Sequence, residues 1–403
     1  MTMTQPLQGL RVLDLSRVVS GPYWTQMLAD HGADVIKVEP PGGDETRRFG
    51  PPFAGDDATY FLSINRGKRS IAVDLKTEQG LKLVLDLAAR ADVVVENFRP
   101  GVAERLGVGP KALCGRDPKL IYCSISGYGH EGVAPFNQLP GYDLILQGVG
   151  GIASLTGPVD GLPHKIGASL ADIIAALNAY GGLMTALYER ERTGLGRHLD
   201  VSMFDGQVSA LMYHATAQLN GGHASRRHGN AHASLCPYEL FEVRGGYLNI
   251  ACANDRQFRA LCDVLQLSEL KDDARFASNA VRVAHRDELL GYLQPKLVES
   301  DTDTWMARFA DAGIPCGPIA RVEDVLSHPQ VAARGLILEH PSGDDGLVRT
   351  VASATGFPAG DQQSRCPPRL GEHGIEVVRE ELGYDEAQIA KLIEAGALCH
   401  ASR

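Results

Sequence analysis

The chain has 403 residues, of which 44% are hydrophobic and 22% charged, and its formal net charge is −10 at pH 7. This composition is ordinary for a soluble globular enzyme, and the length predicts two lobes because domains average roughly 150 residues. The negative charge argues against general binding to nucleic acid, since neutralising phosphates requires a basic surface. No stretch holds the roughly 18 uninterrupted apolar residues of a membrane span, so we expect no membrane partner either.

The N-terminal stretch MTMTQPLQGLRVLDLS lacks a basic segment followed by an apolar one, so we expect a cytoplasmic protein. The eight cysteines form no C-x-x-C pair, which predicts free thiols and argues against a disulfide scaffold or a structural zinc site. His228 and His232 have a spacing that could suit a metal, but Gly229 and Asn230 between them disfavour a helix. We therefore expect no metal.

Strands and helices alternate through the first half of the chain. This alternation favours a parallel sheet with helices on both faces. In chain order, the apolar patterns predict a strand at 10–16, a helix at 21–33, strands at 34–40 and 69–75, a helix at 77–90, strands at 91–98 and 118–129, a long helix at 168–192 and a strand at 197–205.

A second, smaller lobe is predicted from about residue 225 to 330, where the pattern of elements changes. Residues 238–253 read as a hairpin that turns at Gly245 and Gly246, and helical patterns follow it. Near the end of the chain, residues 371–396 predict two short amphipathic helices.

Basic residues gather in one region of this acidic chain. They fall close to predicted strand ends and loops, where parallel sheets bind their ligands. The bias suggests a phosphate-bearing ligand, although a solvated charged face explains it equally well from charge alone. The residues are Arg47, Arg48, Arg66, Lys68, Arg69, Lys76, Arg99 and Arg105.

Asp172 is the single charged residue in the small, apolar stretch GASLADIIAALNAYGG, residues 167–182. Ser169 and Asp172 have the spacing of a capping box at the start of a helix. A helix start also keeps a carboxylate ionised, which is the form that attacks an acyl carbon. From the residues alone, capping is the favoured interpretation and a catalytic nucleophile is the alternative.

A series of motifs runs through most of the chain: LRVLDLSRVVSGP, ADVIKVEPPGGDETR, NRGKRSIAVDLKTEQG, ADVVVENFRPG, ERLG, SGYG, PGYDLILQGVGG, the Asp172 helix, ALYERERTGLGRHLDVSMFD and AGIPCGPI. In this order they resemble the class III CoA-transferases, which include formyl-CoA and carnitine CoA-transferases and, as a divergent branch, α-methylacyl-CoA racemase. The resemblance implies a doubly wound, Rossmann-like large domain built from 1–224 and 331–403 and a smaller α+β domain at 225–330. It also implies a homodimer whose subunits interlock like rings.

The resemblance makes Asp172 the catalytic nucleophile. Its carboxylate would attack an acyl-CoA, and the reaction would pass through an aspartyl anhydride and an aspartyl-CoA thioester. Such a site must exclude water, because hydrolysis would compete with transfer. No cofactor is expected to stay bound, since the coenzyme A thioester is itself a substrate.

Contacts to CoA are carried over from the family to several matching positions. One departure is Pro40, which stands where some members have an arginine, so Arg47 or Arg48 is expected to hold a phosphate instead. The carried-over residues are Val19, Ser20, Val73, Asp74, Leu75, Lys76, Asn97, Phe98, Arg99, Arg105 and Tyr142.

The stretch RRHGNAHASLCPY replaces the glycine-rich flap of formyl-CoA transferase. Its Arg227, His228, Asn230 and His232 could clamp a second carboxylate, with a purely structural loop equally possible. A clamp would predict a dicarboxylyl donor such as succinyl-CoA, and an acceptor such as itaconate, mesaconate, malate or glutarate.

Two other functions stay open at this point. The racemase branch pairs its aspartate with a histidine in G-H-D, whereas this chain reads Gly141-Tyr142-Asp143, and a tyrosine with a pKa near 10 is a poor acid/base group. Transfer is therefore favoured over racemisation. A non-catalytic CoA-binding protein is the remaining alternative, and it predicts that Asp172→Ala leaves biological activity intact.

Overall fold

A computed structural model describes residues 5–222, 224–342, 346–357 and 365–399 of the chain. The chain divides into two compact units. The large unit comprises Met1–Ile152, Ile166–Thr216 and Pro329–Arg403, and the small unit comprises Ala153–Lys165 and Ala217–His328. The sequence placed 153–165 in the large domain, because nothing in those residues marks a separate segment, whereas the structure assigns them to the small unit.

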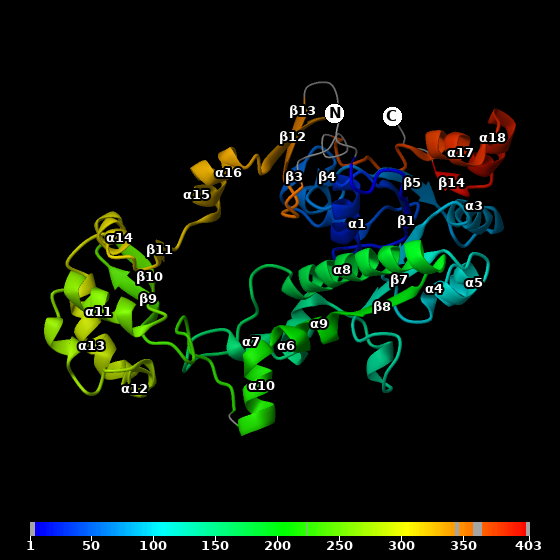
Figure 1. Cartoon of the computed structure of the whole chain (residues 1–403). Coiled ribbons are helices and arrows are strands. Elements are labelled where there is room, and N and C mark those ends of the chain that lie inside the picture. The colour runs from blue at the N-terminus through cyan, green and yellow to red at the C-terminus, as the bar shows by residue number, and fades with distance from the viewer. Residues whose placement is uncertain (1–4, 223, 343–345, 358–364, 400–403) are drawn as a thin grey trace. The chain divides into compact units, whose positions relative to one another are not determined.

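The large unit contains a seven-stranded sheet in the order β14-β5-β2-β1-β6-β7-β8. Figure 1 labels β1, β5, β7, β8 and β14 of this sheet. Its strands are parallel except β14, which pairs antiparallel with β5. Because β2 and β5 lie on one side of β1 while β6 and β7 lie on the other, the strand order reverses between β1 and β6. The strands are β1 (Arg11–Asp14), β2 (Asp34–Glu39), β5 (Arg69–Val73), β6 (Val93–Glu96), β7 (Ile121–Ser126), β8 (His198–Ser202) and β14 (Leu398–Cys399).

Both faces of this sheet are buried under helices. Leu13 and Val94 face α3 (Glu78–Ala88), α17 (Gly374–Leu382) and α18 (Glu386–Glu394), while Val12 and Val93 face α1 (Ser20–Asp30) and α8 (Leu170–Thr193). Strands buried on both sides explain the continuous apolar runs of the sequence. The predicted α/β fold with a parallel sheet is confirmed.

Helix α8 is long and apolar enough to span a membrane by length and composition alone. Its small face packs into the core of the large unit through residues such as Ala175 and Ala179, so we interpret it as a core helix. It ends at Gly194, whose left-handed backbone (φ 72°) terminates the helix as the sequence predicted.

Shorter elements complete the large unit. They are the 3₁₀ helices Glu45–Arg48 and Phe136–Gln138, α2 (Thr59–Leu62), α4 (Val102–Leu106), α5 (Pro110–Cys114), α6 (Asp143–Val149), α9 (Met203–Ala210), α16 (Pro329–Ala333), and the strand pairs β3 (Phe53–Ala54) with β4 (Asp57–Ala58) and β12 (Ile337–Ser342) with β13 (Gly346–Val351).

The small unit has its own core around an antiparallel sheet in the order β11-β10-β9. Strands β9 (Tyr238–Val243) and β10 (Gly246–Ala251) form the predicted hairpin, and Gly245 at its turn has a φ of 81°. The remaining elements are β11 (Cys316–Pro318), the 3₁₀ helix Ser268–Lys271, α11 (Asp255–Val264), α12 (Asn279–Ala284), α13 (Arg286–Leu297), α14 (Thr302–Asp311) and α15 (Val322–Leu326), with α7 (Ile152–Leu155) and α10 (Met212–Gly221) at the junctions between the units.

Candidate active site

A cavity of about 360 Å³ opens in the large unit where the strand order of the sheet reverses. Open α/β sheets bind ligands at this position, beyond the carboxyl ends of the strands. The loops that follow β1, β6 and β7 all reach it. Its lining is Arg17, Val18, Val19, Ser20, Glu45, Asn97, Phe98, Arg99, Pro100, Ile125, Ser126, Gly127, Leu139, Pro140, Gly141, Tyr142, Asp143, Asp172 and Met203.

Asp172 lies in the first turn of α8 and faces this cavity. Burial raises the pKa of its carboxyl to about 7, and the nearby charge of Asp143 acts in the same direction. Hydrogen bonds from the hydroxyl and backbone N–H of Ser20 oppose this rise in pKa. This rise in pKa runs against the expectation that the start of the helix keeps the Asp172 carboxylate ionised.

The sequence predicted a capping box formed by Ser169 and Asp172, and this prediction is wrong. Ser169 makes no side-chain capping bond to the helix. Instead, the backbone N–H of Ala171 donates to Oδ1 of Asp143 at 2.9 Å, so the cap comes from another helix, α6. Gln147 of α6 also holds the preceding segment, since its Oε1 accepts the N–H of Ile166 at 2.7 Å.

Two quoted motifs, SGYG and PGYD, meet beside the cavity through a pair of glycines. A Cβ placed on Gly127 would lie 2.6 Å from Cα of Gly141, and one placed on Gly141 would lie 2.4 Å from Cα of Gly127. Both distances are below any normal contact, so this close approach of two backbones requires glycine on each side.

Six of the residues carried over from the family line the same cavity as Asp172. They are Val19, Ser20, Asn97, Phe98, Arg99 and Tyr142. Asn97 is tied to the loop after β1, because its Oδ1 accepts the N–H of Arg17 at 2.8 Å and its Nδ2 donates to the carbonyl of Arg17 at 2.6 Å.

The other carried-over residues lie outside this lining. Arg105 lines a neighbouring hollow of about 600 Å³ together with Arg99. Val73 pairs with Leu398 of β14, and Asp74 accepts the N–H of Lys76 at 2.9 Å in the turn after β5.

Arg47 does not reach the cavity, which corrects the expectation that it binds a phosphate. Its guanidinium is buried, donates to both carboxylate oxygens of Glu39 at 2.7 and 2.8 Å, and donates to Asp57 at 2.8 Å. It also lies 3.6 Å from the centre of the Phe61 ring. Arg48 is directed to the carbonyl of Gly42 at 2.8 Å.

Three more of the eight basic residues are internal ion-pair partners and do not form a basic surface. Arg66 pairs with Asp30, Lys68 with Asp14, and Arg69 with Asp34 and Glu381, and all three basic side chains are buried. The sequence could not distinguish these from surface charges, because each acidic partner lies far away in the chain.

Two residues of the site were missed by the sequence reasoning. Arg17 stacks over the ring of Phe98 at 5.7 Å and pairs with Glu45 at 3.4 Å, and its position directly after a predicted strand was the available signal. Asp143 stood inside the quoted motif PGYD, but its contact with α8 leaves no local pattern.

The loop proposed as a carboxylate clamp belongs to the small unit. Arg227 donates to the carbonyls of Pro158 at 3.1 Å and Gly161 at 2.8 Å, which ties it to the segment 153–165. Nδ1 of His232 accepts the N–H of Ser234 at 3.0 Å, while Arg286 donates to the carbonyl of His232 at 2.7 Å. These bonds order the loop. Contact of its Arg227, His228, Asn230 and His232 with a substrate stays a prediction.

Across the described ranges, no group of three or more His, Cys, Asp or Glu side chains is arranged to hold a metal ion. All eight cysteines are free thiols.

Comparison with known proteins adds to this geometry. The model of CoA-transferase family III matches residues 7–374. The chain is 41% identical to a succinyl-CoA:glutarate CoA-transferase from Mus musculus, over 98% of this chain and 90% of the relative. It is 40% identical to an acetyl-CoA:oxalate CoA-transferase from Acetobacter aceti, over 95% of this chain and 97% of the relative. A solved CAIB/BAIF family protein from Brucella suis matches with a TM-score of 0.84 at 42% identity, covering 94% of this chain and 100% of the other.

These similarities extend through both units, so they include the cavity and the helix that carries Asp172. The family match and the names of the relatives agree with the order of motifs read from the sequence. The chain therefore belongs to CoA-transferase family III and is a CoA-transferase.

Proposed function

We propose that this CoA-transferase moves CoA from succinyl-CoA to a second dicarboxylic acid, with glutarate as the first acceptor to test, and that Asp172 is its nucleophile. The observation that carries the proposal is the carboxylate of Asp172, which faces a cavity at the ligand-binding edge of the sheet. The relatives named for glutarate and oxalate both act on dicarboxylates, and this supports the same substrate class here.

The transfer proceeds in four exchanges that conserve the thioester energy. The Asp172 carboxylate attacks the acyl carbon of succinyl-CoA, forming a mixed anhydride and releasing CoA thiolate. The thiolate attacks the aspartyl carbon, which gives aspartyl-CoA and free succinate. The acceptor carboxylate then attacks aspartyl-CoA, forming a second anhydride and CoA thiolate, and attack of this thiolate on the acceptor's acyl carbon regenerates Asp172.

Ser20 is placed to stabilise negative charge in the two steps in which the aspartyl carbon is attacked. Ser20 lines the cavity together with Asp172, and its hydroxyl and N–H act to lower the pKa of the Asp172 carboxyl. When the aspartyl carbon is attacked, negative charge grows on the same oxygens, and fixed donors stabilise such a charge more strongly than the ground state.

The CoA thioester is held by residues on both sides of the strand reversal. Asn97, Phe98 and Arg99 follow β6 and line the cavity, while Arg99 and Arg105 bring positive charge to the adjacent hollow, where the phosphates of CoA fit. The proposed enzyme has three further parts. They are the CoA contacts at residues 73–76, the carboxylate clamp in the loop at 226–238 and an interlocked second subunit.

The test mixes the protein with succinyl-CoA or acetyl-CoA and a panel of acids that contains glutarate, oxalate, itaconate, mesaconate and malate. New CoA esters are followed by mass spectrometry, with succinyl-CoA and glutarate expected to exchange fastest. Asp172→Ala should abolish exchange, whereas Asp303→Ala, which removes an exposed aspartate from the first turn of α14, should not.

Exchange that survives Asp172→Ala would overturn the proposed nucleophile. Exchange confined to monocarboxylic acids, with none of the five dicarboxylates accepted, would overturn the substrate class. A covalent CoA adduct on the tryptic peptide that contains Asp172 is the expected intermediate.

A further inference from the structure

The loop between β1 and α1 contains a valine in an unusual backbone conformation. Val18 has a φ of 66°, in the left-handed region that β-branched residues rarely adopt. Such a conformation is strained and persists only where surrounding contacts enforce it. Val18 is two residues before Ser20, which lines the same cavity as Asp172.

Side chains hold five backbone polar groups of residues 16–18 in this loop. Asp14 accepts the N–H of Ser16 at 2.9 Å, and Lys37 donates from Nζ to the carbonyl of Ser16 at 3.0 Å. Asn97 holds both polar groups of Arg17, as described above. The N–H of Val18 lies 3.3 Å from each carboxylate oxygen of Asp44.

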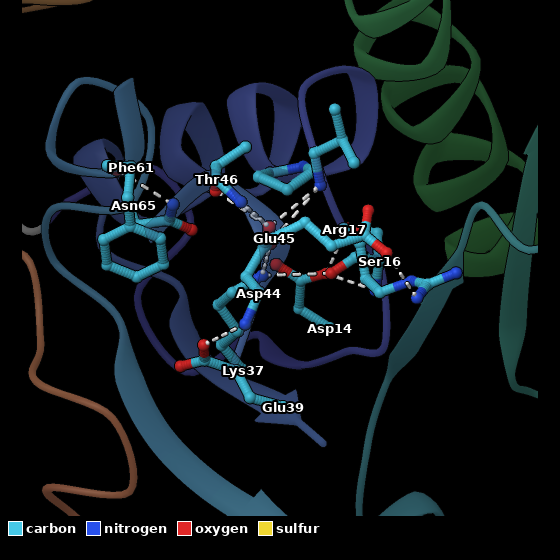
Figure 2. Close-up of polar contacts among 12 residues, drawn as sticks. Asp14, Ser16, Arg17, Lys37, Glu39, Asp44, Glu45, Thr46, Phe61 and Asn65 are labelled. Atoms are coloured by element: carbon cyan, nitrogen blue, oxygen red, sulfur yellow. Dashed lines mark hydrogen bonds and ion pairs between the residues drawn. The ribbon is translucent and has the colours of Figure 1, made fainter. Parts of the chain in front are cut away.

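Two of these side chains form a fully buried ion pair. Nζ of Lys37 lies 3.0 Å from Oδ2 of Asp44, and the two side chains are 1% and 0% exposed. Asp44 is fixed in turn, because its own N–H donates to Glu39 at 2.9 Å and it accepts the N–H of Thr46 at 3.0 Å. Figure 2 shows Lys37, Asp44, Glu39 and Thr46 grouped beside Ser16 and Arg17.

A displacement of this loop must pass to the start of α1, because the two are in tight contact. A Cβ on Gly21 would lie 2.2 Å from the Cβ of Ser16, so no side chain fits between them. Ser20 is next to Gly21 and is buried. The direction in which Ser20 presents its donors therefore follows from the conformation of residues 16–18.

We infer that Lys37 and Asp44 are positioning residues, which hold Val18 in its left-handed conformation and thereby direct Ser20 at Asp172. The inference rests on the proposed function, because Ser20 acts there on the nucleophile. Neither residue touches the cavity. A buried ion pair adds little stability over apolar side chains of the same shape, so the geometry that it imposes on the loop is its contribution.

The first experiment compares Asp44→Asn with Asp30→Asn. Asp30 is an equally buried acid in the same unit, and it pairs with Arg66 and Ser353, neither of which belongs to the β1–α1 loop. Each variant therefore leaves a buried cation without its carboxylate partner. In steady-state exchange, Asp44→Asn should lower kcat by about 10- to 100-fold, more than it raises KM, since a shift of about 1 Å in a catalytic group has effects of this size. Asp30→Asn should retain kcat.

The second experiment tests whether the effect passes through Val18. Glycine adopts a positive φ without strain, so Val18→Gly should restore at least part of the kcat lost in Asp44→Asn. If Asp44→Asn does not fold, the double variant Lys37→Met/Asp44→Asn removes both charges and takes its place in the same comparisons.

Equal kcat values for Asp44→Asn and Asp30→Asn would overturn the inference, as would a loss of kcat that Val18→Gly does not relieve. Failure of the proposed function is recognised separately, because the unaltered protein would then show no exchange. If the unaltered protein exchanges CoA and the two asparagine variants have the same kcat, the positioning role of Lys37 and Asp44 is overturned and the proposed function stands.

Discussion

The carboxylate of Asp172, the proposed nucleophile, has a pKa near neutrality. Burial raises this pKa to about 7, so only part of the protein has the carboxylate ionised at neutral pH. An ionised carboxylate in a poorly solvated position is a stronger nucleophile than one in water, since less hydration must be removed during attack. The same environment that weakens its acidity therefore favours its reaction.

The rate of exchange should rise with pH. Only the ionised form of Asp172 attacks, so kcat/KM is expected to increase through a midpoint of about 7, the pKa of this group in the free enzyme. Asp143→Asn removes the neighbouring charge that helps to raise this pKa, and should move the midpoint to lower pH. Initial rates across about pH 5 to 9 measure both, and a flat profile for the unaltered protein would contradict the assignment.

Ionisation of Asp172 should also lower the free energy of unfolding at high pH. Its pKa in the folded protein lies above the ordinary 3.8, so the folded state binds the proton more tightly than the unfolded chain does. Unfolding free energy therefore falls as pH rises from about 4 to 7, and the loss is complete above that range.

Replacing the carboxylate with a neutral amide removes this cost. Asp172→Asn is expected to be about 1 kcal/mol more stable than the unaltered protein at about pH 8, and no more stable at about pH 4. Thermal unfolding at the two pH values tests this expectation. A variant that is less stable at both would show that the carboxylate makes net favourable contacts.

At the scale of elements, the start of α8 depends on α6. The cap at Ala171 is supplied by Asp143, and Ser169 contributes no capping bond. Asp143→Ala should lower the unfolding free energy by about 1 kcal/mol, whereas Ser169→Ala should change it by less than about 0.5 kcal/mol. The unfolding free energies are compared at about pH 5, because Asp172 is protonated there and does not repel Asp143. Equal losses for the two variants would restore Ser169 as the cap.

Most elements of the large unit could be predicted because their signals are local. The apolar runs of β1, β2, β5 and β6, and the length of α8, are visible in windows of a few residues. The cap from Asp143 could not be predicted, since it joins two helices whose contact no short window records. The proposed role of Asp172 as nucleophile also has no local signal: the pattern around Asp172 favours a cap, and only the order of distant motifs indicated catalysis.

At the scale of the whole molecule, buried ion pairs join distant parts of the chain within the large unit. Arg66 and Asp30 are both 0% exposed, and Arg66 also donates to the carbonyl of Val351 at 2.8 Å. This contact joins the N-terminal half of the chain to the hairpin of β12 and β13. Four of the basic residues that the sequence brought to notice are such internal partners, namely Arg47, Arg66, Lys68 and Arg69.

Breaking this pair should destabilise the large unit strongly. Arg66→Met leaves Asp30 buried without its main partner and is expected to cost about 3–5 kcal/mol. Arg349→Met in the same hairpin removes an exposed pair with Glu339 and should cost less than about 1 kcal/mol. Urea unfolding followed by Trp24 fluorescence, in a Trp305→Phe background, reports the large unit alone. Similar costs for both variants would contradict the difference in burial.

The pairing of β14 with β5 has a consequence for how the protein is made. Leu398 lies opposite Val73, so the edge of the central sheet is completed by a segment that is synthesised long after β5. The small unit lies between the two parts of the large one and holds a core of its own, so it is synthesised in full before that edge can close. Until then, apolar strands of the large unit are partly exposed, and such an incompletely folded state is prone to aggregation. Expression yield is therefore expected to depend on chaperones that protect the nascent large unit, more than on the final stability of the fold.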